Sequence, residues 1–224
     1  GTMSRLEAEA SLPTTIDVDY LVKVPDDGDP TTDFDTTVYY IGLDAKRHPF
    51  PGSQVYFSWY ENFDQVRTID TSTLTAIPLG TPVLVRPGTV MVKIQSDART
   101  FAVEPGNYTI RHVADEATAV ALYGANWNKR IIDIEPTYWS RFTMGSTLSG
   151  NLHPAGSVLR ESASGTTYYF DGTNKRAFSG SSAMSANMFQ EKYVIVAPTG
   201  NAWISKPAGA AIVGFEDALF SLQR

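Results

Sequence analysis

The chain has 224 residues, of which 42% are hydrophobic and 12% aromatic, and its formal net charge at pH 7 is −6. This length can bury a sizeable core, and this charge argues against nucleic-acid binding, which requires a basic surface. The absence of cysteine excludes disulfides, thiol catalysis and thiolate metal sites. No segment has the length of uninterrupted apolar sequence that a membrane span needs, so we expect no transmembrane helix.

The sequence predicts a lead-in, three tandem repeats and a C-terminal cap. The lead-in starts with Gly1-Thr2-Met3, which is typical of a tag remnant, so we expect a native leader or upstream domain before it. One or two helical turns follow and end at Pro13. The five predicted segments are residues 1–15, 16–81, 82–146, 147–214 and 215–224.

The three repeats share one order of features. Each opens with an apolar strand that carries a basic residue, continues into an aromatic strand and an arginine, and closes with a glycine. These features fall at Lys23, Lys93 and Arg160; at Tyr39, Phe101 and Tyr168; at Arg47, Arg111 and Arg176; and at Gly80, Gly145 and Gly209. Repetition at a fixed period is typical of stacked or ring-like architectures, whose copies need their neighbours to bury an apolar face.

A short helix and a further strand complete each repeat. The predicted helices are 54–60, 114–123 and 179–189, and the predicted strands after them are 66–69, 131–134 and 193–196. The fold class that follows is mainly β with short helices (α+β), built from three ββ(β)αβ repeats. A closed pseudo-threefold, propeller-like arrangement would leave the fewest exposed strand edges, and a linear stack is the alternative. A final helix at 215–222 is expected to cover one exposed edge.

The motifs of the first repeat resemble those of a known family. They are Leu21-Val22-Lys23, Val38–Ile41 with Lys46-Arg47 and Phe50, Phe57-Ser58-Trp59, and Pro78-Leu79-Gly80. This pattern is similar to that of tandem modules in exported, cell-surface-associated proteins of bacteria and archaea. The resemblance implies an extracellular or cell-surface location and an interaction role beside surface-layer, adhesive or wall-associated regions. It carries over no catalytic or ligand residue.

An acidic loop in the first repeat is the best candidate for a metal site. It is an insertion relative to the other repeats and contains five carboxylates around Gly28: Asp26, Asp27, Asp29, Asp33 and Asp35. Calcium binds six to eight oxygens, which flexible Asp-rich loops can supply. A solvated turn is the preferred interpretation, because these residue types favour turns and no Glu closes a twelve-residue calcium loop. Calcium is the alternative.

Aromatic residues offer a possible ligand-binding surface. Trp59 and Trp127 recur at the helices of successive repeats, so we expect them in the core. Trp203 and Tyr168 break this pattern and are expected to be exposed, where they could stack on sugar rings.

The recurrent arginines and the three histidines are interpreted as structural. A group present in every repeat normally serves packing, so we expect Arg47, Arg111 and Arg176 to pin their hairpins through carbonyls of a neighbouring repeat. His48, His112 and His153 lie in no nucleophile motif.

The sequence therefore favours a non-catalytic attachment or assembly module of an exported surface protein, with other surface proteins or cell-wall and glycan components as partners. A carbohydrate-binding or carbohydrate-cleaving protein is the alternative, because aromatic and acidic residues are abundant.

Overall fold

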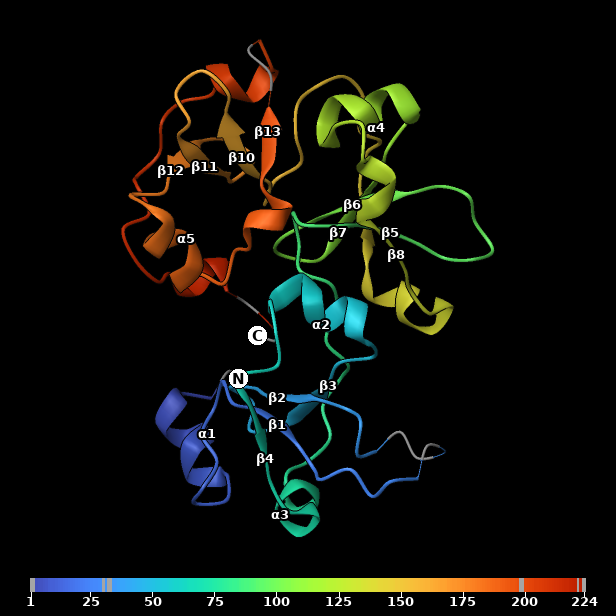
Figure 1. The fold of residues 1–224 in the computed structure, drawn as a ribbon, viewed down its shortest axis with the longest axis vertical. Helices are drawn as coiled ribbons and strands as arrows, with labels where there is room; N and C mark the ends of the chain where they lie inside the picture. Colours follow the sequence, from blue (N-terminus) through green and yellow to red (C-terminus); the bar gives the residue numbers. More distant parts are fainter. Residues whose placement is uncertain (1–2, 30, 32–33, 198–199, 221, 223–224) are drawn as a thin grey trace. The chain divides into compact units, whose positions relative to one another are not determined.

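The computed structural model describes residues 3–29, 31, 34–197, 200–220 and 222. The chain divides into two compact units, residues 1–85 with 221–224 and residues 86–220. The first unit contains one β-sheet and the second contains two (Figure 1).

The first unit is a four-stranded sheet with three short helices. The sheet has the strand order β3-β2-β1-β4. Its elements are α1 (Arg5–Ser11), β1 (Leu21–Lys23), β2 (Tyr39–Ile41), β3 (Arg47–Pro49), α2 (Ser53–Trp59), β4 (Val66–Thr68) and α3 (Thr71–Ala76). The predicted lead-in helix is confirmed, and Ser4 caps it through a reciprocal pair of bonds with Glu7.

The second unit contains a five-stranded and a four-stranded sheet. The strand orders are β8-β5-β6-β7-β9 and β12-β11-β10-β13. The elements of the five-stranded part are β5 (Met91–Lys93), β6 (Phe101–Glu104), β7 (Thr109–His112), α4 (Glu116–Tyr123), η1 (Trp127–Arg130), β8 (Ile131–Asp133), η2 (Pro136–Arg141) and β9 (Thr143–Met144). Those of the four-stranded part are β10 (Val158–Glu161), β11 (Thr167–Phe170), β12 (Lys175–Ala177), α5 (Ser181–Ala186), η3 (Glu191–Tyr193), β13 (Ile195–Ala197), η4 (Ala202–Ser205) and η5 (Asp217–Leu219).

All three sheets follow one plan. The opening strand is central: it pairs antiparallel with the second strand and parallel with the strand after the helix. The third strand pairs antiparallel with the second. A parallel partner needs a long crossover, which the helix of each repeat supplies. The fold is thus α+β and β-rich, as the sequence predicts.

The turn into each opening strand also recurs. Asp19, Gly88 and Gly156 donate their N–H groups to Ile41, Val103 and Phe170, at the end of the second strand. All three have a positive φ, at 67°, 77° and 89°. Glycine adopts this conformation without strain, and aspartate, the residue type at position 19, is one of the few others that tolerate it.

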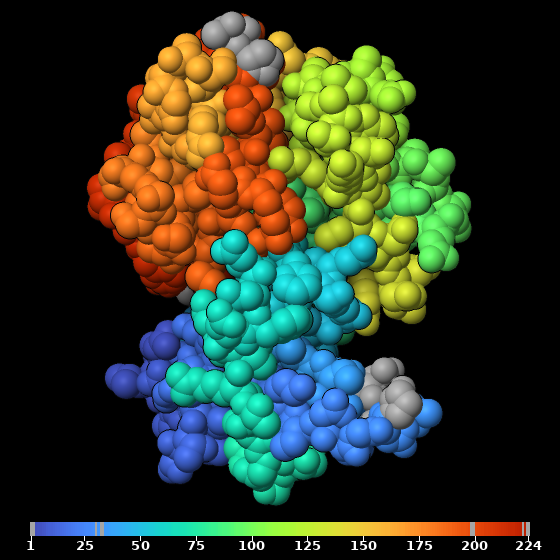
Figure 2. Space-filling model, viewed as in Figure 1, coloured from blue at the N-terminus to red at the C-terminus, as the bar shows by residue number. Residues whose placement is uncertain are grey.

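Each unit has its own core. In the first, Val22, Ile41, Leu74 and Ile77 are buried with the inner face of α1. In the second, one cluster joins the five-stranded sheet to the four-stranded one through Met91, Leu122, Leu159, Phe170 and Trp203. The segments 86–150 and 151–220 lie against each other in the space-filling view (Figure 2).

Two expectations about the fold need correction. The predicted final helix is wrong in length: among the described residues of 215–222, only the single 3-10 turn η5 forms. The described strands form three separate sheets and no closed barrel or propeller. The described residues contain no helix with the length and apolarity of a membrane span.

Candidate functional site

The short segment that contains each closing glycine lies beside the third strand, at one edge of its sheet. Leu79, Met144 and Ala208 stand beside the third strand through parallel bridges to Arg47, Ile110 and Lys175. The glycine that follows each of them donates its N–H to the carbonyl of that same third-strand residue, at 2.8 to 3.0 Å. The three closing segments are therefore equivalent in position.

This register corrects the predicted arginine set. The residue after the bridge position is His48 in the first repeat, Arg111 in the second and Arg176 in the third. Arg47 is therefore not the equivalent of Arg111 and Arg176; its guanidinium lies over the Tyr39 ring, 5.4 Å from the centroid. The sequence places two basic residues side by side there, and only strand pairing selects between them.

Each of these basic side chains crosses its closing glycine and hydrogen-bonds the next carbonyl. His48 Nδ1 lies 2.8 Å from the Thr81 oxygen, Arg111 Nε 2.9 Å from that of Ser146, and Arg176 Nε 2.9 Å from that of Ala210. A β-carbon on Gly80 would lie 2.4 Å from the His48 ring, and one on Gly209 would lie 2.9 Å from Arg176. The pinning role is thus supported, but the carbonyls belong to the same repeat and not to a neighbouring one.

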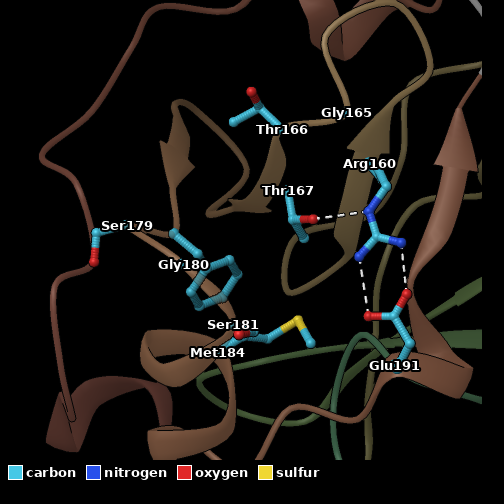
Figure 3. A pocket seen from close by; sticks show the side chains of 10 residues that line it. Arg160, Gly165, Thr166, Thr167, Ser179, Gly180, Ser181, Met184 and Glu191 are labelled. Atoms are coloured by element: carbon cyan, nitrogen blue, oxygen red, sulfur yellow. Dashed lines mark hydrogen bonds and ion pairs between the residues drawn. The ribbon is translucent and has the colours of Figure 1, made fainter.

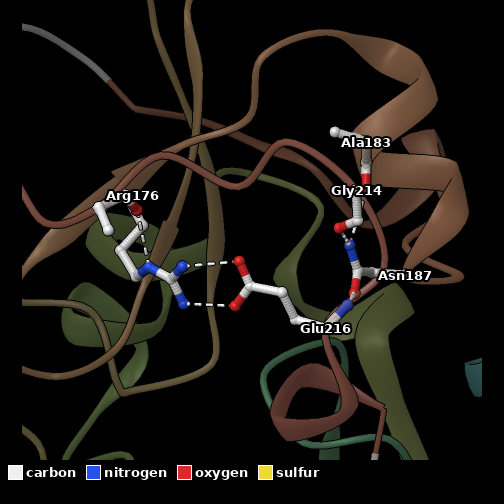
Figure 4. Close-up of polar contacts among 6 residues, drawn as sticks. Arg176, Ala183, Asn187, Gly214 and Glu216 are labelled. Atoms are coloured by element: carbon white, nitrogen blue, oxygen red, sulfur yellow. Dashed lines mark hydrogen bonds and ion pairs between the residues drawn. The ribbon is translucent and has the colours of Figure 1, made fainter.

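A carboxylate completes each basic contact. Asp44 accepts from His48, Glu104 from Arg111, and Glu216 from Arg176 in a bidentate pair of 2.8 and 2.9 Å (Figure 4). Asn187 fixes the segment before Glu216, because its amide bonds the Gly214 carbonyl and the Glu216 N–H. The hydrogen bonds of these basic groups therefore fix each closing segment to the third strand of its sheet.

The acidic loop brings three of its five aspartates together. Asp26, Asp27 and Asp35 each place one carboxylate oxygen within 4.8 Å of the others. Asp35 is buried at 3% exposure and accepts the Asp27 N–H at 2.8 Å. Asp29 instead accepts from Thr31, and these bonds lower the pKa of its carboxyl. Asp33 lies outside the described residues. The cluster has the oxygen ligands of a hard-cation site, but its hydrogen bonds also fit a self-capped turn.

The expected aromatic surface is wrong for Trp203. Its side chain is 0% exposed and belongs to the core of the second unit. Tyr168 is partly buried against it, with ring centroids 5.6 Å apart. The ammonium of Lys175 lies over both rings and donates to the Ile204 carbonyl at 2.6 Å. Sequence could not show this burial, because the core around Trp203 comes from strands distant along the chain.

The three histidines lie in different environments. His48 is 2% exposed and lies between Asp44 and the Thr81 carbonyl. His112 is partly buried beside Phe101, with ring centroids 5.6 Å apart. His153 is 2% exposed, and burial lowers its pKa to about 4, with a smaller contribution from Arg130.

One cavity in the four-stranded part, the hydroxyl-lined pocket, has a volume of about 300 Å³. Thr166, Thr167, Ser179 and Ser181 contribute hydroxyls, while Phe178 and Met184 contribute apolar surface. Arg160 also lines it, bonding Thr167 at 3.0 Å and Glu191 through both carboxylate oxygens at 2.5 and 2.9 Å (Figure 3). The hydrogen bond from Arg160 lowers the pKa of Glu191.

A second cavity, the cationic pocket, has a volume of about 550 Å³. It lies between the end of α4 with η1 and the 3-10 helix η3. Its lining residues are Tyr123, Gly124, Ala125, Asn126, Lys129, Arg130, Lys192 and Tyr193. Three of these are basic and none is acidic, although the whole chain has 24 acidic and 18 basic residues. The sequence shows Lys129-Arg130 but gives no sign that Lys192 and Tyr193 lie beside them.

Comparison with known proteins adds no relative: no protein-family model, curated protein or solved structure matches the chain.

Proposed function

We propose that this chain is a non-catalytic attachment or assembly module of an exported cell-surface protein. The observation that carries the proposal is the apolar residue before the closing glycine. Leu79 is 62% exposed and Met144 57% exposed, and both occupy the same place on the outermost row of a sheet. Exposed edges with apolar side chains are templates for pairing with another chain.

The polar groups of the repeats support this role. Each of the repeated basic residues bonds a carbonyl of its own repeat and a carboxylate, which for Arg176 is that of Glu216 in the C-terminal segment. What the repeats share at the surface is therefore the edge and not a polar site. The resemblance of the motifs to surface-protein modules adds the extracellular setting and the surface or cell-wall partners.

Binding to isolated bacterial cell envelopes tests the proposal. The purified protein should co-sediment with envelopes or self-associate with rising concentration in sedimentation velocity runs. Met144→Lys should weaken this association, because lysine on an edge opposes pairing. Val120→Lys is the matched control, since Val120 is a 43% exposed apolar residue on the helix α4. A protein that stays monomeric and unbound at all concentrations contradicts the proposal.

The alternative function, carbohydrate recognition, is favoured by the hydroxyl-lined pocket alone. Its lining combines hydroxyl-bearing residues and the Arg160–Glu191 pair with the apolar Phe178 and Met184, as the polar and apolar faces of a sugar require. A glycan array tests it, with Thr167→Val as the variant that removes a hydroxyl and keeps the shape. Binding to one glycan class that Thr167→Val abolishes would favour this alternative.

A further inference from the structure

We propose that the cationic pocket binds a small ligand that carries an oxyanion group: a phosphate, sulfate or carboxylate. This inference is independent of attachment through the sheet edges. It rests on the charge and the size of the pocket and on hydrogen-bond donors of residues 123, 125 and 126.

The partly buried charge of the pocket is Arg130. Its guanidinium bonds the carbonyls of Thr89, Tyr193 and Val194, at 3.0 to 3.4 Å, and no described carboxylate. Carbonyls satisfy its N–H groups but do not neutralise its charge, and burial consequently lowers its pKa. A nearby anion would stabilise this guanidinium.

The pocket also lacks an internal anion. The acid nearest in sequence, Glu191, belongs to the same 3-10 helix as Lys192 and Tyr193. Its carboxylate is held by Arg160 in the hydroxyl-lined pocket (Figure 3). Two neighbouring residues of η3 thus line different cavities: Glu191 lines the hydroxyl-lined pocket and Lys192 lines the cationic pocket. The α4 C-terminus offers only about half a negative charge, against the positive charges of Lys129 and Arg130.

Unused hydrogen-bond donors line the same cavity. Within the described structure, the hydroxyl of Tyr123 has no hydrogen-bond partner, although the residue is 7% exposed. The N–H groups of Ala125 and Asn126 likewise bond no described residue, because the chain turns at Gly124 with a φ of 81°. Backbone N–H groups beside cations are the donors that proteins use for oxyanions.

The cavity volume limits the ligand to a small molecule. About 550 Å³ falls within the range of small-molecule sites, and it is larger than a bare inorganic anion needs. Tyr123 and Tyr193 add flat apolar surface next to the charges. The chemistry therefore fits an oxyanion attached to a polar ring better than a free ion.

Titrations followed by NMR test the inference on the full chain. The probes are inorganic phosphate, sulfate, glucuronate and glucose 6-phosphate, with glucose as the neutral control. We expect saturable shifts at the amides of Gly124, Ala125 and Asn126 with the anions and none with glucose. The shifts should weaken with added sodium chloride, because salt screens partly exposed charges. Tighter binding of the sugar-linked anions than of phosphate would identify a ring-bearing ligand, and the reverse a free oxyanion.

Two conservative variants assign the contacts. Lys129→Gln should raise the Kd about three- to tenfold, since Lys129 is exposed and bonds no described acid. Tyr123→Phe keeps the ring and should weaken binding similarly by removing one donor. Lys206 lines neither pocket, so the Lys206→Gln variant should bind the anions with the affinity of the parent protein. Thermal melts report whether each variant is folded. The inference is overturned by absence of saturable shifts, by equal shifts with glucose, or by parental affinity in both pocket variants.

Discussion

Gly88 and Gly156 pack backbone against backbone in the second unit, where a β-carbon on Gly88 would lie 2.0 Å from the Gly156 carbonyl oxygen. Both glycines form the turn that opens a sheet, so two equivalent turns of successive repeats meet at one point. No side chain fits between them, and this contact makes the glycine at each turn a requirement of packing as well as of φ.

Replacement of Gly88 by alanine should therefore destabilise the second unit by about 2 kcal/mol or more. The strain of a positive φ and the backbone clash both contribute. Gly106→Ala is the matched control, because Gly106 has a φ of 90° but no atom within 4 Å of its β-carbon position. That variant should lose about 1 kcal/mol, from strain alone. Urea denaturation measures both; equal losses would show that the Gly156 contact has no energetic weight.

Gly80→Ala should disrupt the closing contact of the first repeat. The new β-carbon would displace the His48 ring, which is buried and cannot move into solvent. We expect a loss of about 1–3 kcal/mol from overpacking, with loss of the His48 bonds to Asp44 and Thr81. Gly52→Ala, in open space in the same unit, should cost less than about 1 kcal/mol. Unfolding curves and the His48 ring resonances would reveal a contrary result.

His153 should make stability fall as the pH decreases from about 6.5 to 4. Burial lowers its pKa to about 4 in the folded chain, whereas the unfolded chain binds the proton near 6.5. The unfolded state therefore gains protons first, and the contribution lost reaches about 3 kcal/mol by pH 4. His153→Gln should flatten this part of the stability curve, measured by denaturation at several pH values. An unchanged difference between the two proteins across this range would contradict the assignment.

Calcium is expected to leave the melting temperature of the chain unchanged. Asp35 already accepts the Asp27 N–H, and Asp29 is turned to Thr31, so the loop satisfies part of its own charge. Scans in chelator and in millimolar calcium measure the effect. A cation bound at a hundred times its Kd would add about 2.7 kcal/mol, and such a rise would establish a site at Asp26, Asp27 and Asp35.

The strand plan was predictable because its signals are local. Alternating apolar residues and turn residues place the strands around Val22, Val92 and Leu159 correctly. The sequence could not show that His48, and not Arg47, is the equivalent of Arg111 and Arg176. The two residues are adjacent, and a one-residue difference in register leaves the composition of the strand unchanged. The helix expected at 179–189 is shorter, since Asn187 turns to bond Gly214.

The candidate site was out of reach of the sequence for a different reason. Lys129-Arg130 and Lys192-Tyr193 are separated by a whole repeat, and each pair alone is typical of a solvated turn. Their common cavity arises only when the two sheets of the second unit pack together. Trp203 is the opposite case: the sequence predicts that it is exposed, but its side chain is buried in the core that the two sheets of the second unit share.

The central position of each opening strand has a consequence during translation. Leu21 must wait for Val66, and Met91 for Ile131, before its second edge is paired. Until then the nascent chain carries a hairpin with one open side, and that side can accept the wrong partner strand from another repeat. Because the three repeats share one plan, the emerging polypeptide risks exchanging strands between its own copies, and slower elongation would prolong that risk.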